Sequence, residues 1–353
     1  MGESTDSQRI FWIDTIRFIA MMWVFTVHFI ATYNSDLFYY WRNGISQYIL
    51  MGITGKLAVA MFTVLLGYFA AAKSTSRPNL TEYTANRYFQ FASPLLIVNS
   101  IIVLLAVINT RITCFAFTYN PDVHNVKNII SDSFLFNTQI LPTFWCIRPF
   151  FISSVLIVVL NKEKCSILFQ LLAMTVIIYS GYPWIGICIM GSILYKFINS
   201  SRYSKMRFFY NRFVQLAVFL VAAIMIKRQE STSTYVIDGI ACALVLTIIF
   251  YNQRIQRIFS CKSVSRLGRV SLYIYLLHVP IYSTIGKVVL SLASANNVSY
   301  QTAFWASYVC CFVANIILSI GLEKCISLLN TLITRITKMI KERTGSICSN
   351  ELN

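Results

Sequence analysis

Three ionisable side chains interrupt the first apolar stretch of the chain. Asp14, Arg17 and His28 lie in the run WIDTIRFIAMMWVFTVH, residues 12–28, which is otherwise mostly apolar. Asp14 and Arg17 are three residues apart, so on a helix they are neighbours and can form an ion pair. Arg17 and His28 are eleven residues apart, which on an α-helix is a turn of ~20° and a rise of ~16 Å. All three therefore line one stripe of a helix.

These residue types are suited to acid–base and anion chemistry. Histidine titrates near neutrality and can act as a general base, and the guanidinium of Arg17 offers a planar fork of donors to a phosphate or a carbonyl. An ionisable residue at bilayer depth costs ~2.5–3.5 kcal/mol on insertion scales, which makes each one a functional candidate. The alternative is structural, with Asp14 and Arg17 as a packing pair and His28 as an interfacial residue.

The composition indicates that most of the chain lies in a membrane. Of 353 residues, 57% are hydrophobic and 12% are charged, whereas soluble domains carry about 25% charged residues. About 20 apolar residues cross a bilayer. The sequence therefore predicts an all-α polytopic membrane protein with about ten transmembrane helices, at 10–30, 48–72, 88–108, 142–160, 166–181, 183–198, 212–228, 235–251, 270–292 and 300–322.

The net charge of +17 reflects topology rather than nucleic-acid binding. The basic residues flank the apolar segments, mainly in the N-terminus, in every second connection and in the tail after residue 323. By the positive-inside rule this distribution places both termini in the cytoplasm. The connections of the opposite side hold few basic residues, namely Arg42, Arg111, Lys127, Lys227 and Arg228. The ten cysteines are scattered without a CxxC pair, so neither a metal site nor a disulfide framework is expected.

Five sequence blocks, in order along residues 10–282, resemble the membrane acyltransferase-3 family. The first helix carries the family's mark, an arginine, ten residues and a histidine, at Arg17 and His28. The other blocks are GKLAVAMFTVLLGYF (55–69), NRYFQFASP (86–94), LPTFWCIRPFF (141–151) and GRVSLYIYLLHVPIY (268–282). Two positions depart from the pattern. Leu66 replaces the usual serine before Gly67, and Gln90 replaces a second basic residue, which leaves Arg87 alone to meet a phosphate.

The resemblance implies an enzyme, an integral membrane O-acyltransferase over residues 1–325, with a basic and possibly amphipathic cytoplasmic tail over 326–353. Family members transfer an acyl group, commonly acetyl, from cytoplasmic acyl-CoA to a hydroxyl of a cell-surface or lipid-linked sugar. Acyl-CoA is then a donor substrate, and no bound cofactor or metal is expected. Membrane lipids are expected partners, nucleic acid is not, and the expected location is a bacterial plasma membrane.

On this reading each candidate residue has a role. His28 is the catalytic base. Arg17 holds a phosphate or the pantetheine of CoA, or polarises the thioester carbonyl, and Asp14 orients Arg17. Arg87 can receive the nucleotide. The remaining site candidates are less specific, and each also has a plain structural reading: Arg148 as oxyanion or acidic-sugar ligand, His278 beside Pro280 as substrate ligand or alternative base, and His124 in an outside loop. Lys56 and Asp238 are interpreted as interface residues near the outer ends of their spans.

Two other functions also fit a polar pathway through about ten helices. A transporter or polysaccharide export component needs such a pathway, and inverted repeats would favour it, but residues 1–160 and 161–322 show no self-similarity. A sensor or scaffold would normally bring an extra soluble domain, and no such domain is recognisable. Acyl transfer is therefore the leading hypothesis.

Overall fold

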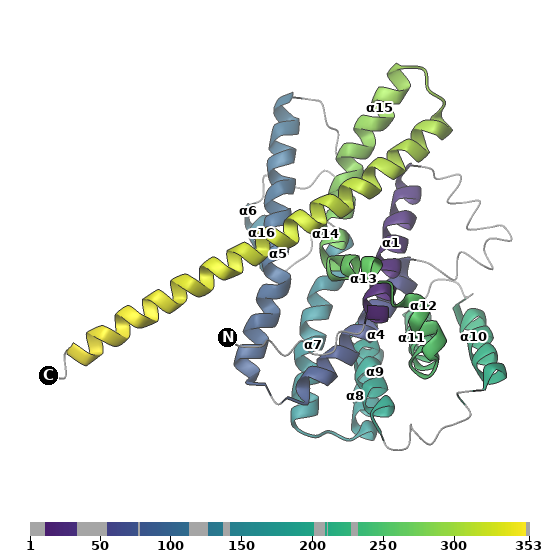
Figure 1. Cartoon of the computed structure of the whole chain (residues 1–353), viewed down its shortest axis with the longest axis vertical. Helices are drawn as coiled ribbons and strands as arrows, with labels where there is room; N and C mark the ends of the chain where they lie inside the picture. The colour runs from purple at the N-terminus through teal and green to yellow at the C-terminus, as the bar shows by residue number, and fades with distance from the viewer. Residues whose placement is uncertain are drawn as a thin grey trace.

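The computed structural model describes residues 11–33, 55–76, 78–112, 126–136, 142–200, 209, 211–226 and 232–350. Within these ranges the chain is helical and contains no strand (Figure 1). The predicted all-α class is therefore confirmed. The main helices are α1 (Phe11–Tyr33), α4 (Gly55–Ser74), α5 (Leu80–Ile112), α6 (Val126–Ser133), η2 (Pro142–Cys146), α7 (Ile147–Lys162), α8 (Ile167–Tyr179), α9 (Pro183–Ile198), α10 (Arg212–Ile226), α11 (Thr232–Tyr251), α12 (Gln253–Phe259), α13 (Lys262–Arg269), α14 (Ser271–Ile281), η5 (Tyr282–Gly286), α15 (Lys287–Ala295) and α16 (Tyr300–Asn350).

In its described part, each of the ten predicted spans coincides with helix, and the ninth is divided into α14, the π-helical turn η5 and α15. Among the described residues, 7 helices are long and apolar enough to cross a membrane. The helices α8, α9 and α10 have 13, 16 and 15 residues, which at ~1.5 Å per residue is ~20–24 Å, shorter than a ~30 Å hydrocarbon core. The multi-pass membrane fold is confirmed, while ten crossings and the side of the termini stay predictions.

Helix α1 belongs to two hydrophobic cores. Its first half contributes Trp12, Ile13 and Ile16 to a core shared with α4, α9 and α11. Its second half contributes residues from Met21 to Ile30 to a larger core with α5, α14 and α16. The helix that carries the three ionisable residues is therefore packed along its length, which holds their side chains in place relative to the rest of the bundle.

The helices α4 and α9 pack backbone against backbone. A Cβ at Gly67 would overlap the carbonyl of Cys188, and a Cβ at Gly191 would overlap the carbonyl of Val64. Small residues allow such approaches between membrane helices, where apolar burial contributes little to association. This crossing determines how far the N-terminal end of α4 lies from that of α9.

Apolar side chains cover the outside of the bundle. Leu168 and Leu172 of α8 are 76% and 62% exposed, and Phe213 of α10 is 83% exposed. Exposing such apolar surfaces to water would be unfavourable, so they are suited to contact with lipid. Figure 1 shows α16 running obliquely across the bundle, against α14, and extending well beyond it. The helix is continuous from Tyr300 to Asn350, so the predicted boundary between membrane domain and tail at residue 325 falls inside it.

Candidate active site

The predicted ion pair at the start of α1 is present. Nη1 of Arg17 lies 3.6 Å from Oδ1 of Asp14, and the two side chains are 33% and 14% exposed. The short basic helix α13 packs along α1 at this level, and Gly268 lies so close to Asp14 that a methyl group there would overlap its backbone. An accessible guanidinium is thus held beside a helix whose last turn contains Arg266 and Arg269.

The second half of α1 brings His28 against His278 of α14. The two imidazole rings meet edge to face, with centroids 5.2 Å apart and an interplanar angle of 87°. Gly55, the first residue of α4, closes the other side, since a Cβ there would lie 3.8 Å from Nε2 of His28. His28 itself is half-buried. The structure therefore joins two histidines that the sequence treats as separate candidates.

The hydrogen bond of His278 determines its tautomer. Its Nδ1 lies 2.5 Å from the carbonyl oxygen of Tyr275, and a carbonyl only accepts, so Nδ1 carries the proton. Nε2 is then a lone-pair acceptor. The side chain is fully buried, and within the described part of the chain Nε2 has no hydrogen-bond partner. A buried acceptor without a partner is costly, so a substrate hydroxyl that reached this atom would satisfy it.

The backbone after His278 departs from a regular α-helix. Pro280 lies inside α14, and the π-helical turn η5 follows directly. Such turns recur at functional sites because they redirect side chains. The hydroxyl of Tyr33, at the end of α1, donates to the Tyr282 carbonyl, and Oγ of Ser307 donates to the Gly286 carbonyl at 3.1 Å. The distortion is thus tied to both α1 and α16.

Tyr275 is a residue of the site that the sequence did not single out. Its carbonyl accepts from His278, and its hydroxyl accepts from Sγ of Cys146 at 3.1 Å. Its ring lies 5.5 Å from that of His278, centroid to centroid. The signal that could have found it is its position one helical turn before a histidine. Tyr275 connects the histidine pair to the start of α7.

Arg87 is engaged inside the protein, between α5 and α7. Its Nε donates to Oγ of Ser154 at 3.2 Å, and its Nη1 donates to Oε1 of Gln90 at 2.5 Å. The guanidinium also lies 5.0 Å from the ring centre of Phe91. Gln90, the departure from the family pattern, is therefore a direct partner of Arg87. A role for this arginine towards the nucleotide stays a prediction.

Arg148 lies on the surface at the start of α7. Its Nη1 donates to the Phe136 carbonyl at 3.1 Å, and its side chain is exposed. The described contacts do not join it to His28, so a role in oxyanion or sugar binding stays a prediction. His124 lies outside the described residues.

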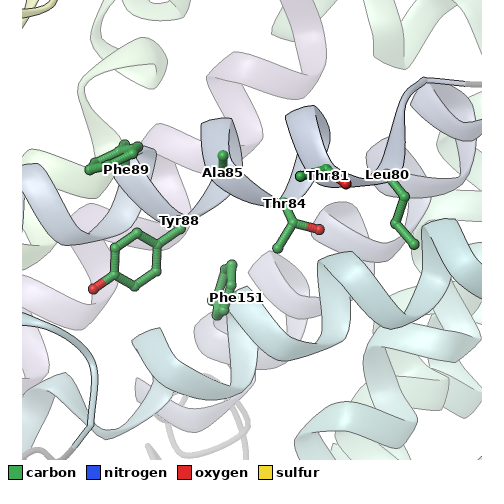
Figure 2. A pocket seen from close by; sticks show the side chains of 7 residues that line it. All are labelled: Leu80, Thr81, Thr84, Ala85, Tyr88, Phe89 and Phe151. Atoms are coloured by element: carbon green, nitrogen blue, oxygen red, sulfur yellow. The ribbon is translucent and has the colours of Figure 1, made fainter.

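An open apolar groove lies elsewhere, between the start of α5 and α7 (Figure 2). It contains threonine and tyrosine hydroxyls but no ionisable acid, base or imidazole suited to activating a substrate. This groove therefore has no residue set for the chemistry considered above. Its lining residues are Leu80, Thr81, Thr84, Ala85, Tyr88, Phe89 and Phe151.

The candidate site thus has two separate parts along one helix. Because α1 is continuous from Phe11 to Tyr33, Arg17 and His28 are ~16 Å apart along it. At this separation, the guanidinium does not contact a substrate group that is hydrogen-bonded to the imidazole. One part is the guanidinium of Arg17, which can bind an anion, and the other is the pair of His28 and His278. A long substrate with an anionic end and a reactive end could occupy both.

A family model described as an acyltransferase domain matches residues 10–324, which includes every candidate residue named above. Neither the curated proteins nor the solved structures contain a match to the chain.

Proposed function

The chain belongs to the membrane acyltransferase-3 family, and from this we propose that it transfers an acetyl group from cytoplasmic acetyl-CoA to a hydroxyl of a cell-surface or lipid-linked sugar. It is an acyltransferase with a multi-pass membrane fold, and we propose the bacterial plasma membrane as its location. The observation that carries the proposal is the meeting of His28 and His278, with an acceptor nitrogen buried beside a half-buried imidazole.

In the proposed reaction His28 is the general base. It takes the proton of the sugar hydroxyl while the hydroxyl oxygen attacks the thioester carbonyl carbon. The carbon–sulfur bond then breaks, and the CoA thiolate leaves and recovers the proton from His28. Of the two histidines, His28 is the better candidate for the base because part of its side chain stays exposed, whereas His278 is fully buried and a cation there is costly.

His278 is proposed to hold the acceptor. With Nδ1–H engaged by the Tyr275 carbonyl, Nε2 can accept a hydrogen bond from the sugar. This contact would orient the acceptor beside His28 before the proton moves. Orientation of this kind lowers the barrier because the reacting atoms are already near their attack geometry.

Arg17 is proposed to bind the donor at its anionic end. Its distance of ~16 Å from His28 along α1 suits an extended pantetheine arm, with phosphate at the guanidinium and thioester at the imidazole. The same separation disfavours the alternative in which Arg17 polarises the thioester carbonyl. Asp14 orients the guanidinium through their ion pair. Arg87 and the basic helices α12 and α13 are candidates for the nucleotide, and Arg148 for an acidic sugar.

The direct test uses the purified protein in lipid nanodiscs with acetyl-labelled CoA and a panel of sugar acceptors. Label should move to an acceptor with release of free CoA thiol in equal amounts. A transporter, the alternative function, would leave the thioester intact. Thiol release without an acylated product, or no thiol release at all, would contradict the proposed transfer.

A further inference from the structure

A row of three aromatic side chains lies at the N-terminal ends of separate helices. The ring centroids of Trp145, in η2, and Trp184, in α9, are 4.8 Å apart. Those of Trp184 and Tyr235, in α11, are 5.1 Å apart. Nζ of Lys56, in α4, lies 4.9 Å from the Tyr235 ring centre. We call Trp145, Trp184 and Tyr235 the aromatic row.

Residues next to the aromatic row in the chain contact the histidine pair or its surroundings at both ends of the row. At one end, Trp145 is followed by Cys146, whose Sγ donates to the hydroxyl of Tyr275. At the other end, Lys56 follows Gly55, which faces Nε2 of His28. Tyr275 in turn contacts His278. The aromatic row therefore lies near the histidine pair, since residues next to Trp145 and Lys56 in the chain contact Tyr275 and His28.

The row retains surface that a ligand can reach. Trp145 is 36% exposed, and Trp184, Tyr235 and Lys56 are each half-buried. Phe25 and Phe29 of the nearby core are, in contrast, fully buried. Trp and Tyr also combine an apolar ring face with a polar tip. The row is thus an accessible apolar surface with hydrogen-bonding groups along its edge.

Charged groups lie at the Tyr235 end of the row. Asp238 follows Tyr235 by one turn of α11, is 8% exposed, and lies within electrostatic reach of Lys56. A pyranose ring has one face of C–H groups and an edge of hydroxyls. Aromatic faces match the first, and an ammonium beside a carboxylate matches the second, since together they can donate to and accept from hydroxyls.

We infer that Trp145, Trp184 and Tyr235 form the acceptor subsite, on which a pyranose ring of the acceptor stacks while Lys56 and Asp238 bind its hydroxyls. The inference rests on the proposed function, which supplies the sugar acceptor. On this inference, the nearness of the row to His28 lets one hydroxyl of the stacked ring reach the base. The row then selects sugars whose apolar face and reactive hydroxyl are correctly placed.

The test compares Trp145→Leu and Tyr235→Leu with wild type in nanodiscs. The probes are the methyl glycosides of glucose, galactose, mannose, rhamnose and N-acetylglucosamine, with acetyl-CoA as donor. The KM for the preferred glycoside should rise about tenfold, while the KM for acetyl-CoA stays constant. Trp145→Phe keeps a ring and should recover most of the affinity. Trp305→Leu, on α16 and away from the row, is the matched control because Trp305 is 43% exposed.

Tryptophan fluorescence gives a second readout that needs no catalysis. A saturable change on adding the preferred glycoside without CoA should shift to about tenfold higher concentration in Trp145→Leu and stay in place in Trp305→Leu. If the wild type transfers no acetyl group but shows this pattern, the proposed function fails and the sugar subsite stands. An unchanged acceptor KM in Trp145→Leu, or no saturable change in wild type with any probe, would overturn the subsite and leave the row as a lipid-facing aromatic belt.

Discussion

At the scale of single residues, the proposed chemistry depends on two imidazoles in different surroundings. His278 is fully buried and its tautomer is set by the Tyr275 carbonyl, while His28 is half-buried and faces Gly55. The two rings can therefore divide the work, one holding the hydroxyl and the other taking its proton. Mutations that remove only one function of each ring should separate these roles.

The change His28→Ala should abolish the base while leaving the bundle intact. Loss of general-base catalysis lowers the transfer rate by ~10²–10⁴-fold. The measurement is label transfer from acetyl-CoA, with the amount of inserted protein checked in the same membranes. Thr32→Ala is the control on the same helix, since the Thr32 hydroxyl donates back to the carbonyl of His28 within α1. Transfer by His28→Ala near the wild-type rate would move the base to His278.

The change His278→Asn keeps a side-chain donor for the Tyr275 carbonyl and loses the Nε2 acceptor. Because the acceptor sugar would lose a buried hydrogen bond, transfer should fall roughly 10- to 100-fold, with a rise in the acceptor KM. The thermal stability in detergent should stay close to that of the wild type. His278→Ala, which also empties the packed volume, should lose both activity and stability. Full activity in the asparagine variant would show that His278 serves packing alone.

The change Arg17→Lys keeps the positive charge at this position and removes the planar set of guanidinium donors. The KM for acetyl-CoA should rise by about tenfold and more than the KM for the acceptor. Asp14→Asn should give a smaller rise in the same direction, because the guanidinium stays but loses its orienting partner. Both KM values come from one initial-rate data set. An equal loss for both substrates, or loss of the protein itself, would indicate a structural pair.

At the scale of elements, the site depends on how the helices cross. Helix α1 has one half in each of two cores, and the π-helical turn η5 is held by Tyr33 and Ser307. The backbone contact of α4 with α9 sets the position of Gly55 and Lys56, at the start of α4, relative to Trp184, at the start of α9. A change at this crossing should disturb the site without touching a candidate residue.

The change Gly191→Ala puts a methyl group into the backbone of α4 at Val64. Overpacking of this kind costs ~1–3 kcal/mol, so the thermal midpoint in detergent should fall and the transfer rate with it. Gly321→Ala on α16 is the matched control, because no atom lies within 4 Å of its added Cβ. Alanine is also the better helix former there. Equal midpoints for the two variants would contradict the close crossing.

At the scale of the whole molecule, the distribution of charge predicts a direction for the reaction. By the positive-inside rule, the basic connections and tail predict that the Arg17 end of α1 lies at the cytoplasm and the His28 end about three turns outward. The proposed donor, acetyl-CoA, is made in the cytoplasm. The acceptor is then expected to approach from the outer side, and the same orientation predicts that the aromatic row lies there, at the N-terminal ends of its helices.

Sealed inverted vesicles, whose cytoplasmic face is exposed, test this geometry. With acetyl-labelled CoA added outside, label should appear on an acceptor enclosed in the lumen, and free CoA should remain outside. The control adds the acceptor outside with the donor, where little transfer is expected. Transfer that requires donor and acceptor on the same face would contradict the geometry across the membrane, even with the chemistry intact.

The sequence by itself determined the features that depend on neighbouring residues. Long apolar runs determine where helices form, because each satisfies its own backbone hydrogen bonds in lipid. The pair of Asp14 and Arg17 follows from a spacing of three residues, and five sequence blocks in order, the first with the arginine–histidine spacing of α1, indicated the family. The family model then matched residues 10–324.

The tertiary structure alone decided which distant residues meet. Nothing local in the sequence pairs His28 with His278, makes Tyr275 the partner that sets a tautomer, or joins Trp145, Trp184 and Tyr235 in a row. It also places Lys56 and Asp238, interpreted from sequence as interface residues, next to that row. The physical reason is that lipid solvates every apolar helix face about equally, so close packing at small residues such as Gly67 and Gly191 decides which faces meet.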